Sequence, residues 1–226
     1  MKQQTLKPDL WIVYDNSDTP EQSWKDIEGM DIGIPIVYTI VSTHPTPIGA
    51  MRNKCLQHAL KEDADYIIFW DDDDYYPPQR IEENIRALEK NPTADISASS
   101  KMYLLLTEEN VLMTTGPFHE THGTAATFCI RSSYAKEHTF DDTKERGEEI
   151  TLTKGWKANL VQVDNPESMI VVMGHARNTV DKSDLLRRPA MYCAKIVNQD
   201  NGRMAFRSRW NPTPQVWGLM KQTFFA

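Results

Sequence analysis

The chain has 226 residues, 40% of them apolar and 25% charged, which is enough for one α/β domain with a sizeable core. Its 32 acidic residues outnumber the 25 basic ones, and the net charge of −7 excludes a general surface for nucleic acid or anionic membranes. Three widely spaced cysteines, Cys55, Cys129 and Cys193, argue against a disulfide framework and favour a cytoplasmic protein. No apolar run reaches membrane-spanning length, so we expect no transmembrane segment.

Apolar strand-like segments alternate with helical patterns along the chain. This alternation predicts an α/β fold with a mainly parallel sheet flanked by helices. The predicted strands lie at 10–14, 34–41, 66–70, 96–99, 102–106, 111–115, 159–163 and 169–173, the strands at 102–106 and 111–115 forming a hairpin. The predicted helices lie at 47–61, from Pro78 onward, and at 132–137, 148–155, 181–188 and 215–225, while 202–213 is polar and irregular. We expect one domain over 1–180 and a C-terminal extension over 181–226 that packs on it.

Four consecutive aspartates, Asp71, Asp72, Asp73 and Asp74, directly follow the apolar strand at 66–70. In open α/β sheets, ligands bind outside the carboxyl ends of the strands. Mg²⁺ and Mn²⁺ prefer oxygen ligands, and they commonly join one or two carboxylates to substrate phosphates. The aspartate run therefore predicts a metal-assisted site for a phosphorylated substrate. Taken alone, it fits a solvated acidic turn equally well.

Three further polar clusters lie in a fixed order around the aspartate run. Asp15 opens a polar turn after the first predicted strand, the sequence 49–53 starts a helix, and Glu148 and Glu149 start a later one. Each cluster also has a purely structural interpretation. Asp15 begins a strong turn sequence, Arg52 could be an exposed helix residue, and the paired glutamates could complement a helix dipole. No glycine-rich phosphate loop of Walker or Rossmann type occurs.

The order and spacing of these motifs resemble the nucleotide-sugar glycosyltransferases of the GT-A fold, most closely those of family 2, over residues 1–175. The resemblance implies that Asp15 hydrogen-bonds the base of the donor and that Arg52 lies near the nucleotide. It also implies that Asp71 and Asp73 are the two carboxylates of a DXD motif. In that motif the first aspartate contacts the ribose, and the second holds Mn²⁺ or Mg²⁺ against the diphosphate.

The same resemblance supplies the remaining candidates. Because the register of four aspartates can slip by one, Asp72 is a further candidate for binding the nucleotide sugar and Asp74 for binding the metal. Glu149 matches the catalytic general base, with Glu148 as its neighbouring alternative, although the family usually has an aspartate there. His175 matches a late metal ligand of some GT-A enzymes.

Together these features predict a metal-dependent glycosyltransferase that moves a sugar, with inversion, from a nucleoside-diphosphate donor to a hydroxyl of a glycan or other acceptor. A UDP-sugar is the favoured donor. A divalent cation would neutralise the leaving diphosphate, and a carboxylate would take the acceptor proton.

Two alternatives stay open, a non-catalytic GT-A-like binding module and a sugar nucleotidyltransferase. Residues 1–5 match the helix after the usual first strand of the family, so that strand is expected to be absent or supplied otherwise, and its absence slightly favours the module over an active enzyme. The nucleotidyltransferase normally needs an early glycine-rich signature, which we do not find. The polar segment 119–124 and Trp156 lie where the family lines its sugar and acceptor pocket, although an ordinary loop and a packed tryptophan fit as well.

Overall fold

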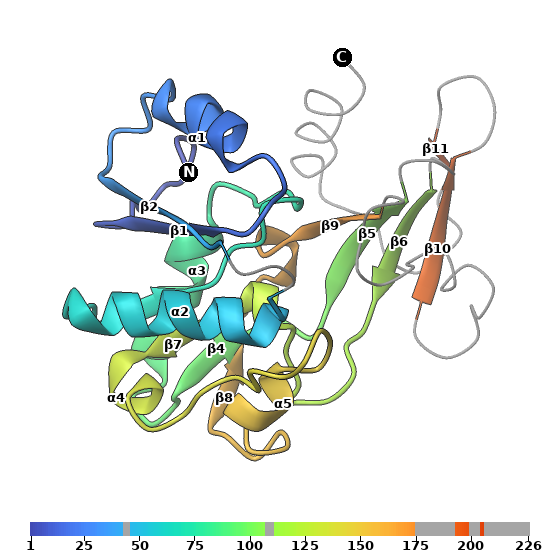
Figure 1. Ribbon diagram of the computed structural model, residues 1–226. Helices are drawn as coiled ribbons and strands as arrows, with labels where there is room; N and C mark the ends of the chain where they lie inside the picture. Colours follow the sequence, from blue (N-terminus) through green and yellow to red (C-terminus); the bar gives the residue numbers. More distant parts are fainter. Residues whose placement is uncertain (43–45, 107–110, 175–192, 199–203, 206–226) are drawn as a thin grey trace.

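A computed structural model describes residues 1–42, 46–106, 111–174, 193–198 and 204–205. Hydrogen bonding divides their strands among three sheets, and helices flank these sheets (Figure 1). The predicted α/β class is therefore confirmed. The helices predicted at 181–188 and 215–225, and most of the irregular segment 202–213, lie outside the described residues. Within the described ranges no helix is both long and apolar enough to cross a bilayer.

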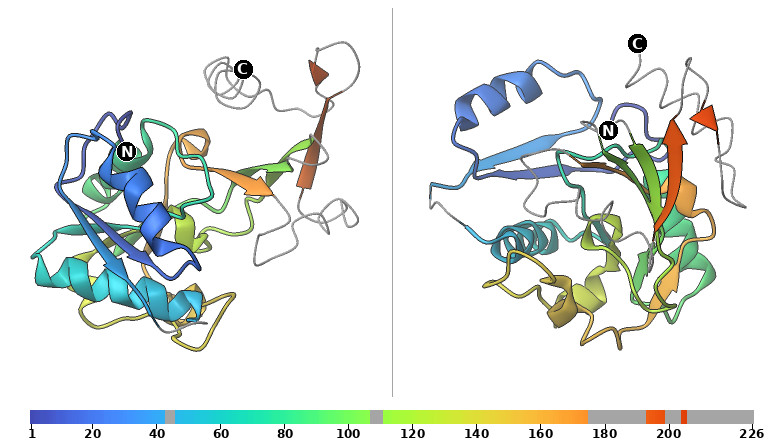
Figure 2. Two further views of the ribbon diagram at one scale, coloured as in Figure 1. Left: turned by 45° about the horizontal axis from the view of Figure 1, so that its top comes forward. Right: turned by 90° about the vertical axis from the view of Figure 1, so that its right-hand side faces the viewer.

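The first sheet has two parallel strands, β1 (Trp11–Asp15) and β2 (Ile36–Ile40). Two helices enclose it, α1 (Pro20–Glu28) and α2 (Ile48–Lys61). Helix α1 covers one face, where the Trp24 ring lies 4.9 Å from the ring of Tyr38, and α2 lies against the other face (Figure 2). The sequence did not predict α1, although parallel strands require a crossover connection. Its large apolar residues are few, and Trp24 and Ile27 alone do not mark a helical pattern.

The second sheet carries the aspartate run and has the strand order β3-β7-β4-β8. Its strands are β3 (Tyr66–Ile68), β7 (Cys129–Arg131), β4 (Ile96–Ala98) and β8 (Leu160–Gln162). Strand β7 runs antiparallel to β3 and β4, whereas β4 and β8 are parallel. The pairing is thus mixed where we predicted a mainly parallel sheet. The sequence pattern locates strands but does not reveal that the short strand β7 enters between β3 and β4.

Three helices accompany the second sheet, α3 (Arg80–Lys90), α4 (Ser132–Ala135) and α5 (Glu149–Leu152). Helix α3 packs on β4 and β8. It begins at Arg80, two residues later than the predicted start at Pro78. Both α4 and α5 are shorter than predicted but lie where the sequence placed them.

The third sheet has the order β11-β10-β6-β5-β9 and extends to one side of the molecule (Figure 2). Its strands are β5 (Met102–Leu106), β6 (Val111–Thr115), β9 (Val171–Gly174), β10 (Cys193–Asn198) and β11 (Met204–Ala205). The predicted hairpin of β5 and β6 is confirmed with its bounds, since the two strands pair antiparallel. The sequence predicted neither β10 nor β11. Because β11 lies within 202–213, the expectation that this segment is irregular was wrong at residues 204–205.

The N-terminal residues form no helix, so the helical match of residues 1–5 was wrong. Instead they bind the start of α3. The buried amide of Gln4 donates to the Pro77 carbonyl at 2.8 Å and accepts the Ile81 N–H at 3.2 Å. The Thr5 N–H donates to the Pro78 carbonyl at 2.8 Å. Because the first N–H groups of a helix have no partner within it, Gln4 supplies a cap from outside the helix.

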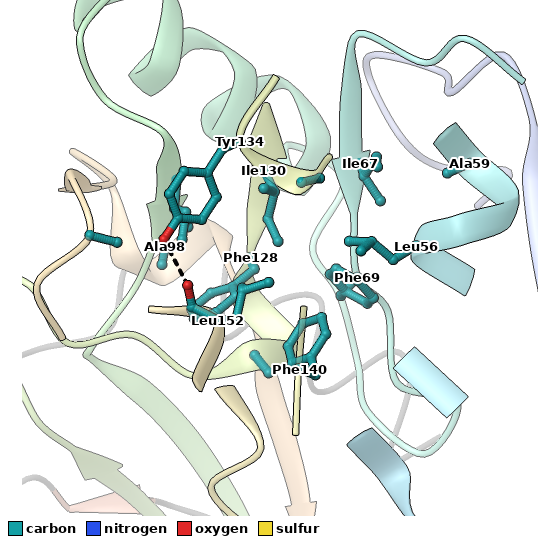
Figure 3. Packing of buried hydrophobic residues seen from close by; sticks show 14 residues of the cluster. Leu56, Ala59, Ile67, Phe69, Ala98, Phe128, Ile130, Tyr134, Phe140 and Leu152 are labelled. Atoms are coloured by element: carbon teal, nitrogen blue, oxygen red, sulfur yellow. Dashed lines mark hydrogen bonds between the residues drawn. The ribbon is translucent and has the colours of Figure 1, made fainter. Parts of the chain in front are cut away.

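The largest core cluster lies between α2, β3, β7 and α5 (Figure 3). Phe69, which follows β3, packs edge-on against Phe140 with 5.0 Å between ring centroids. Tyr134 donates a hydrogen bond to the Leu152 carbonyl at 2.7 Å, which joins α4 to α5. Burying a side chain such as Phe69 contributes roughly 1.5–3 kcal/mol. The residue just before the aspartate run is therefore firmly anchored in the core.

Candidate functional site

The aspartate run forms a short loop that backbone hydrogen bonds hold at both ends. Before it, the Phe69 N–H donates to the Phe128 carbonyl at 3.1 Å. After it, Tyr75 and Val171 exchange two backbone hydrogen bonds of 3.0 and 2.8 Å, which tie the chain to β9. The loop leaves the carboxyl end of β3, where the sequence placed it.

The four aspartates have different surroundings. Asp71 accepts hydrogen bonds from Arg52, whose Nη2 lies 2.9 Å from Oδ1 and 3.1 Å from Oδ2. Asp74 accepts the Met173 N–H at 2.9 Å through Oδ1. Asp72 and Asp73 between them are exposed. The outer members of the run are thus bound to Arg52 and to the Met173 amide, and the two inner residues are exposed.

Charge accumulates at these inner carboxylates. Crowding by the surrounding chain, then repulsion from Asp73, raises the pKa of Asp72, and Asp71 and Asp15 contribute further repulsion. A nearby cation would reverse this shift, because it favours the ionised form.

The donor set suits a cation that completes its coordination with substrate. Within the described ranges no three His, Cys, Asp or Glu side chains converge as a ready-made metal site. Mg²⁺ and related ions usually keep several waters and take one or two carboxylates together with substrate phosphates. Two adjacent exposed carboxylates fit that requirement. His175, the predicted late ligand, lies outside the described residues.

Arg52 joins the aspartate run to the start of α5. It is buried, with 7% of its surface exposed, and its Nε donates to Oε1 of Glu148 at 2.9 Å. Burial alone would lower the pKa of Arg52, but the charges of Asp71 and Glu148 outweigh it and raise that pKa. Arg52 therefore forms an ion triad with Asp71 and Glu148. Its predicted proximity to a nucleotide stays a prediction.

The residues around Arg52 explain why α2 can approach the segment before α5 so closely. A Cβ atom at Gly49 would lie 1.9 Å from the Asp141 carbonyl oxygen, so this position requires glycine. Asn53 donates to the Phe140 carbonyl and accepts its N–H, both at 2.9 Å. The sequence singled out the stretch 49–53 but missed this docking role, because its partners lie about 90 residues away.

Glu149 begins α5 beside the triad and is half-buried. Burial, followed by the charge of Glu148, raises the pKa of Glu149 to about 7. A carboxyl with a pKa near the working pH is well matched to general-base catalysis. Glu148, by contrast, is buried against Arg52. Of the two predicted candidates, Glu149 has the surroundings of a proton acceptor.

Asp15 ends β1 and is bound by its own turn. Its Oδ1 accepts the Ser17 N–H at 2.7 Å, and its Oδ2 accepts a hydrogen bond from the Tyr38 hydroxyl. Partial burial opposes ionisation, but these hydrogen bonds outweigh it and lower the pKa of Asp15. The turn interpretation is therefore observed, and contact with a nucleotide base stays a prediction. The sequence did not reveal the role of Tyr38, which lies 23 residues away.

An aromatic cluster lies beyond α5. The ring of Trp156, a residue with φ of 65°, lies 4.6 Å from the ring of His122. Burial, then the charge of His119, lowers the pKa of His122. The Thr153 hydroxyl donates to the Glu149 carbonyl at 2.8 Å and accepts the Trp156 N–H at 3.3 Å. The position of Trp156 is thus coupled to that of the helix that carries Glu149.

Comparison with known proteins finds one family model that matches this chain. The model described as "Glycosyl transferase family 2" matches residues 1–147, which include Asp15, Arg52 and the aspartate run but end just before Glu148. A solved structure described as "Crystal Structure of A197 from STIV" is 13% identical, with a TM-score of 0.44, over 76% of this chain and 96% of that one. No curated protein matches the chain significantly.

Proposed function

This chain belongs to glycosyltransferase family 2, and we propose that it transfers a sugar from a nucleoside-diphosphate donor to an acceptor hydroxyl. The observation that carries the proposal is the ion triad, in which Arg52 contacts Asp71 on one side and Glu148 on the other. The triad brings together two groups that such a reaction needs, a carboxylate-rich edge for the donor and a carboxylate of raised pKa for the acceptor.

On the donor side, Asp72 and Asp73 are the proposed ligands of Mn²⁺ or Mg²⁺, because these two consecutive aspartates are exposed. When bound, the cation would neutralise the charge that develops on the leaving diphosphate. Asp71 and Asp74 keep the loop in place through Arg52 and the Met173 amide. Contact of Asp15 with the base, a UDP-sugar as donor, and metal ligation by Asp74 and His175 remain parts of the proposal.

On the acceptor side, Glu149 is the proposed general base. A sugar hydroxyl has a pKa far above 7, so a carboxylate that accepts its proton contributes about 10²–10⁴-fold to the rate. Direct attack by that hydroxyl would invert the anomeric centre, and a glycan or other hydroxyl compound would serve as acceptor. Glu148 supports Glu149, because its negative charge raises the pKa of its neighbour.

We also propose that residues 1–180 form the catalytic domain and that residues 181–226 form an extension packed on it. The described part of that extension supports it, since β10 pairs antiparallel with β6 and so adds to the sheet of the main domain.

A non-catalytic binding module is the second candidate. It is favoured by the hydrogen bonds that Asp15 makes within the protein. Its Oδ1 accepts from the Ser17 N–H, and its Oδ2 accepts from the Tyr38 hydroxyl. A donor base that binds Asp15 must therefore share or displace one of these bonds.

A thermal-shift screen of UDP-, GDP- and dTDP-sugars, with and without Mn²⁺, tests the proposal. A ligand that binds only the folded state raises its apparent stability by mass action, by about 2.7 kcal/mol at a concentration of 100 Kd. We expect a Mn²⁺-dependent shift with one donor and slow hydrolysis of that donor.

Asp73→Asn should abolish both the shift and the hydrolysis. The matched control Asp63→Asn changes an exposed aspartate just past the far end of α2 and should leave both intact. Metal-independent binding of the donor, or full hydrolysis by Asp73→Asn, would remove the metal from the proposal. Binding without any turnover would support the module.

A further inference from the structure

Arg80 carries a charge that is buried inside the protein. It is the first residue of α3 and is 0% exposed. Its Nε and Nη1 have no hydrogen-bond partner, and no ion pair between described residues includes it. Burial lowers the pKa of Arg80 to about 10, so it stays protonated at neutral pH.

This placement is unfavourable for the fold itself. A buried charge is costly unless it is paired and hydrogen-bonded. The first turn of a helix is also the positive end of its dipole, where a cation is disfavoured. An apolar side chain of similar length would suit the start of α3 better, so the reason for Arg80 must lie in what it contacts.

The contacts of Arg80 bracket the aspartate run. Its Nη2 donates to the Ala126 carbonyl at 3.1 Å and, over a longer 3.5 Å, to the carbonyl of Phe69, two residues before the run. Its guanidinium carbon lies 5.8 Å from the ring centroid of Tyr76, two residues after the run. The Tyr76 hydroxyl accepts the Asp71 N–H at 2.8 Å. One planar cation thus contacts both ends of the loop that carries the aspartates.

We propose that Arg80 is a positioning residue that clamps the two ends of the aspartate loop from inside the core and so keeps Asp72 and Asp73 directed outward together. The inference rests on the proposed function only for what the loop binds. The clamp requires a planar cation that can lie over a ring while one of its nitrogens reaches the carbonyls on the other side, which the tetrahedral ammonium of lysine does not provide.

The chain offers a matched control at the opposite end of β3. Arg131 donates to the carbonyls of Ala94 and Leu88 at 2.9 and 2.7 Å, and its guanidinium carbon lies 5.5 Å from the Tyr66 ring centroid. Like Arg80, it thus donates to backbone carbonyls beside a tyrosine ring, and it also donates to the Tyr66 hydroxyl at 3.2 Å. Tyr66 begins β3, whereas the aspartate run follows its end. Arg131→Met removes comparable contacts without reaching the loop.

The test compares Arg80→Met, Arg80→Lys and Arg131→Met in the full chain by amide hydrogen exchange and Mn²⁺ titration. In both Arg80 variants the Asp71 amide should exchange about tenfold faster relative to amides of β5, which neither arginine contacts, as expected for local opening. The Mn²⁺ dissociation constant should rise about fivefold, a modest factor because the carboxylates themselves remain. Arg131→Met should change neither value.

Several outcomes would overturn the clamp. The first is an exchange rate at the Asp71 amide that equals the wild-type rate in either Arg80 variant. The second is a wild-type Mn²⁺ dissociation constant in Arg80→Lys. The third is that Arg131→Met changes both values as much as Arg80→Met does. If Arg80→Met does not fold, the lysine variant alone decides by the same criteria. If the wild-type protein binds no Mn²⁺ while Asp71 exchange still responds only to Arg80, the proposed metal site fails and the clamp stands.

Discussion

Replacing Glu149 with glutamine should abolish transfer and, above pH 7, make the protein more stable. Burial and the neighbouring charge of Glu148 raise the pKa of Glu149 from 4.5 to about 7. In the folded protein this carboxyl therefore keeps its proton up to about pH 7, whereas in the unfolded chain it releases it near pH 4.5. Glutamine resembles the protonated form and does not titrate, so it removes the cost of ionising this site.

The sign follows from proton linkage. Between pH 4.5 and about 7, the folded state binds more protons at this site than the unfolded state, so the free energy of unfolding falls as the pH rises. Each pKa unit corresponds to about 1.4 kcal/mol, so the whole shift amounts to about 3 kcal/mol. The wild-type protein loses this stability across the window, and Glu149→Gln keeps it. The two proteins should be about equally stable below pH 4.5.

Urea denaturation at pH 4.5, 6 and 8 measures the difference directly. Glu145→Gln, which changes an exposed glutamate in the segment before α5, is the matched control and should follow the wild-type curve. In activity assays, kcat/KM of the wild-type protein should rise with pH through a midpoint near 7, since the base must be ionised. Parallel stability curves for wild type and Glu149→Gln would refute the assigned surroundings of Glu149. An unchanged turnover rate in that variant would assign the base elsewhere.

Two further substitutions test how α2 holds the site together. Arg52→Met leaves Glu148 buried without its cation, and we expect a loss of about 3–5 kcal/mol in urea denaturation. Adding Glu148→Gln should recover part of that loss, and strict additivity would show that the two side chains do not interact. Gly49→Ala places a Cβ 1.9 Å from the Asp141 carbonyl oxygen, and the required backbone shift should cost about 1–3 kcal/mol. Gly29→Ala, whose Cβ would meet only the Lys25 carbonyl at 3.6 Å, should leave the melting temperature nearly unchanged, and equal losses in both variants would contradict the steric explanation.

Local patterns predicted the elements whose side chains repeat regularly. The hairpin of β5 and β6 was predicted with its bounds, because two apolar runs flank a polar turn. Strand β7 was missed, because it runs directly into α4 with no turn residues between them, and yet it separates β3 from β4. The fold class could therefore be predicted from the sequence, whereas the mixed pairing could not.

For the site, the sequence determined which groups are available. A strand that ends in four aspartates and a helix that begins with two glutamates are local features, because chain neighbours alone decide them. The tertiary structure decided which of these groups are used for folding. It buried Arg52 between Asp71 and Glu148, bound Asp74 to β9, left Asp72 and Asp73 exposed, and raised the pKa of Glu149. Burial and ion pairing depend on residues up to about 100 positions apart, and no local pattern in a single sequence records those distances.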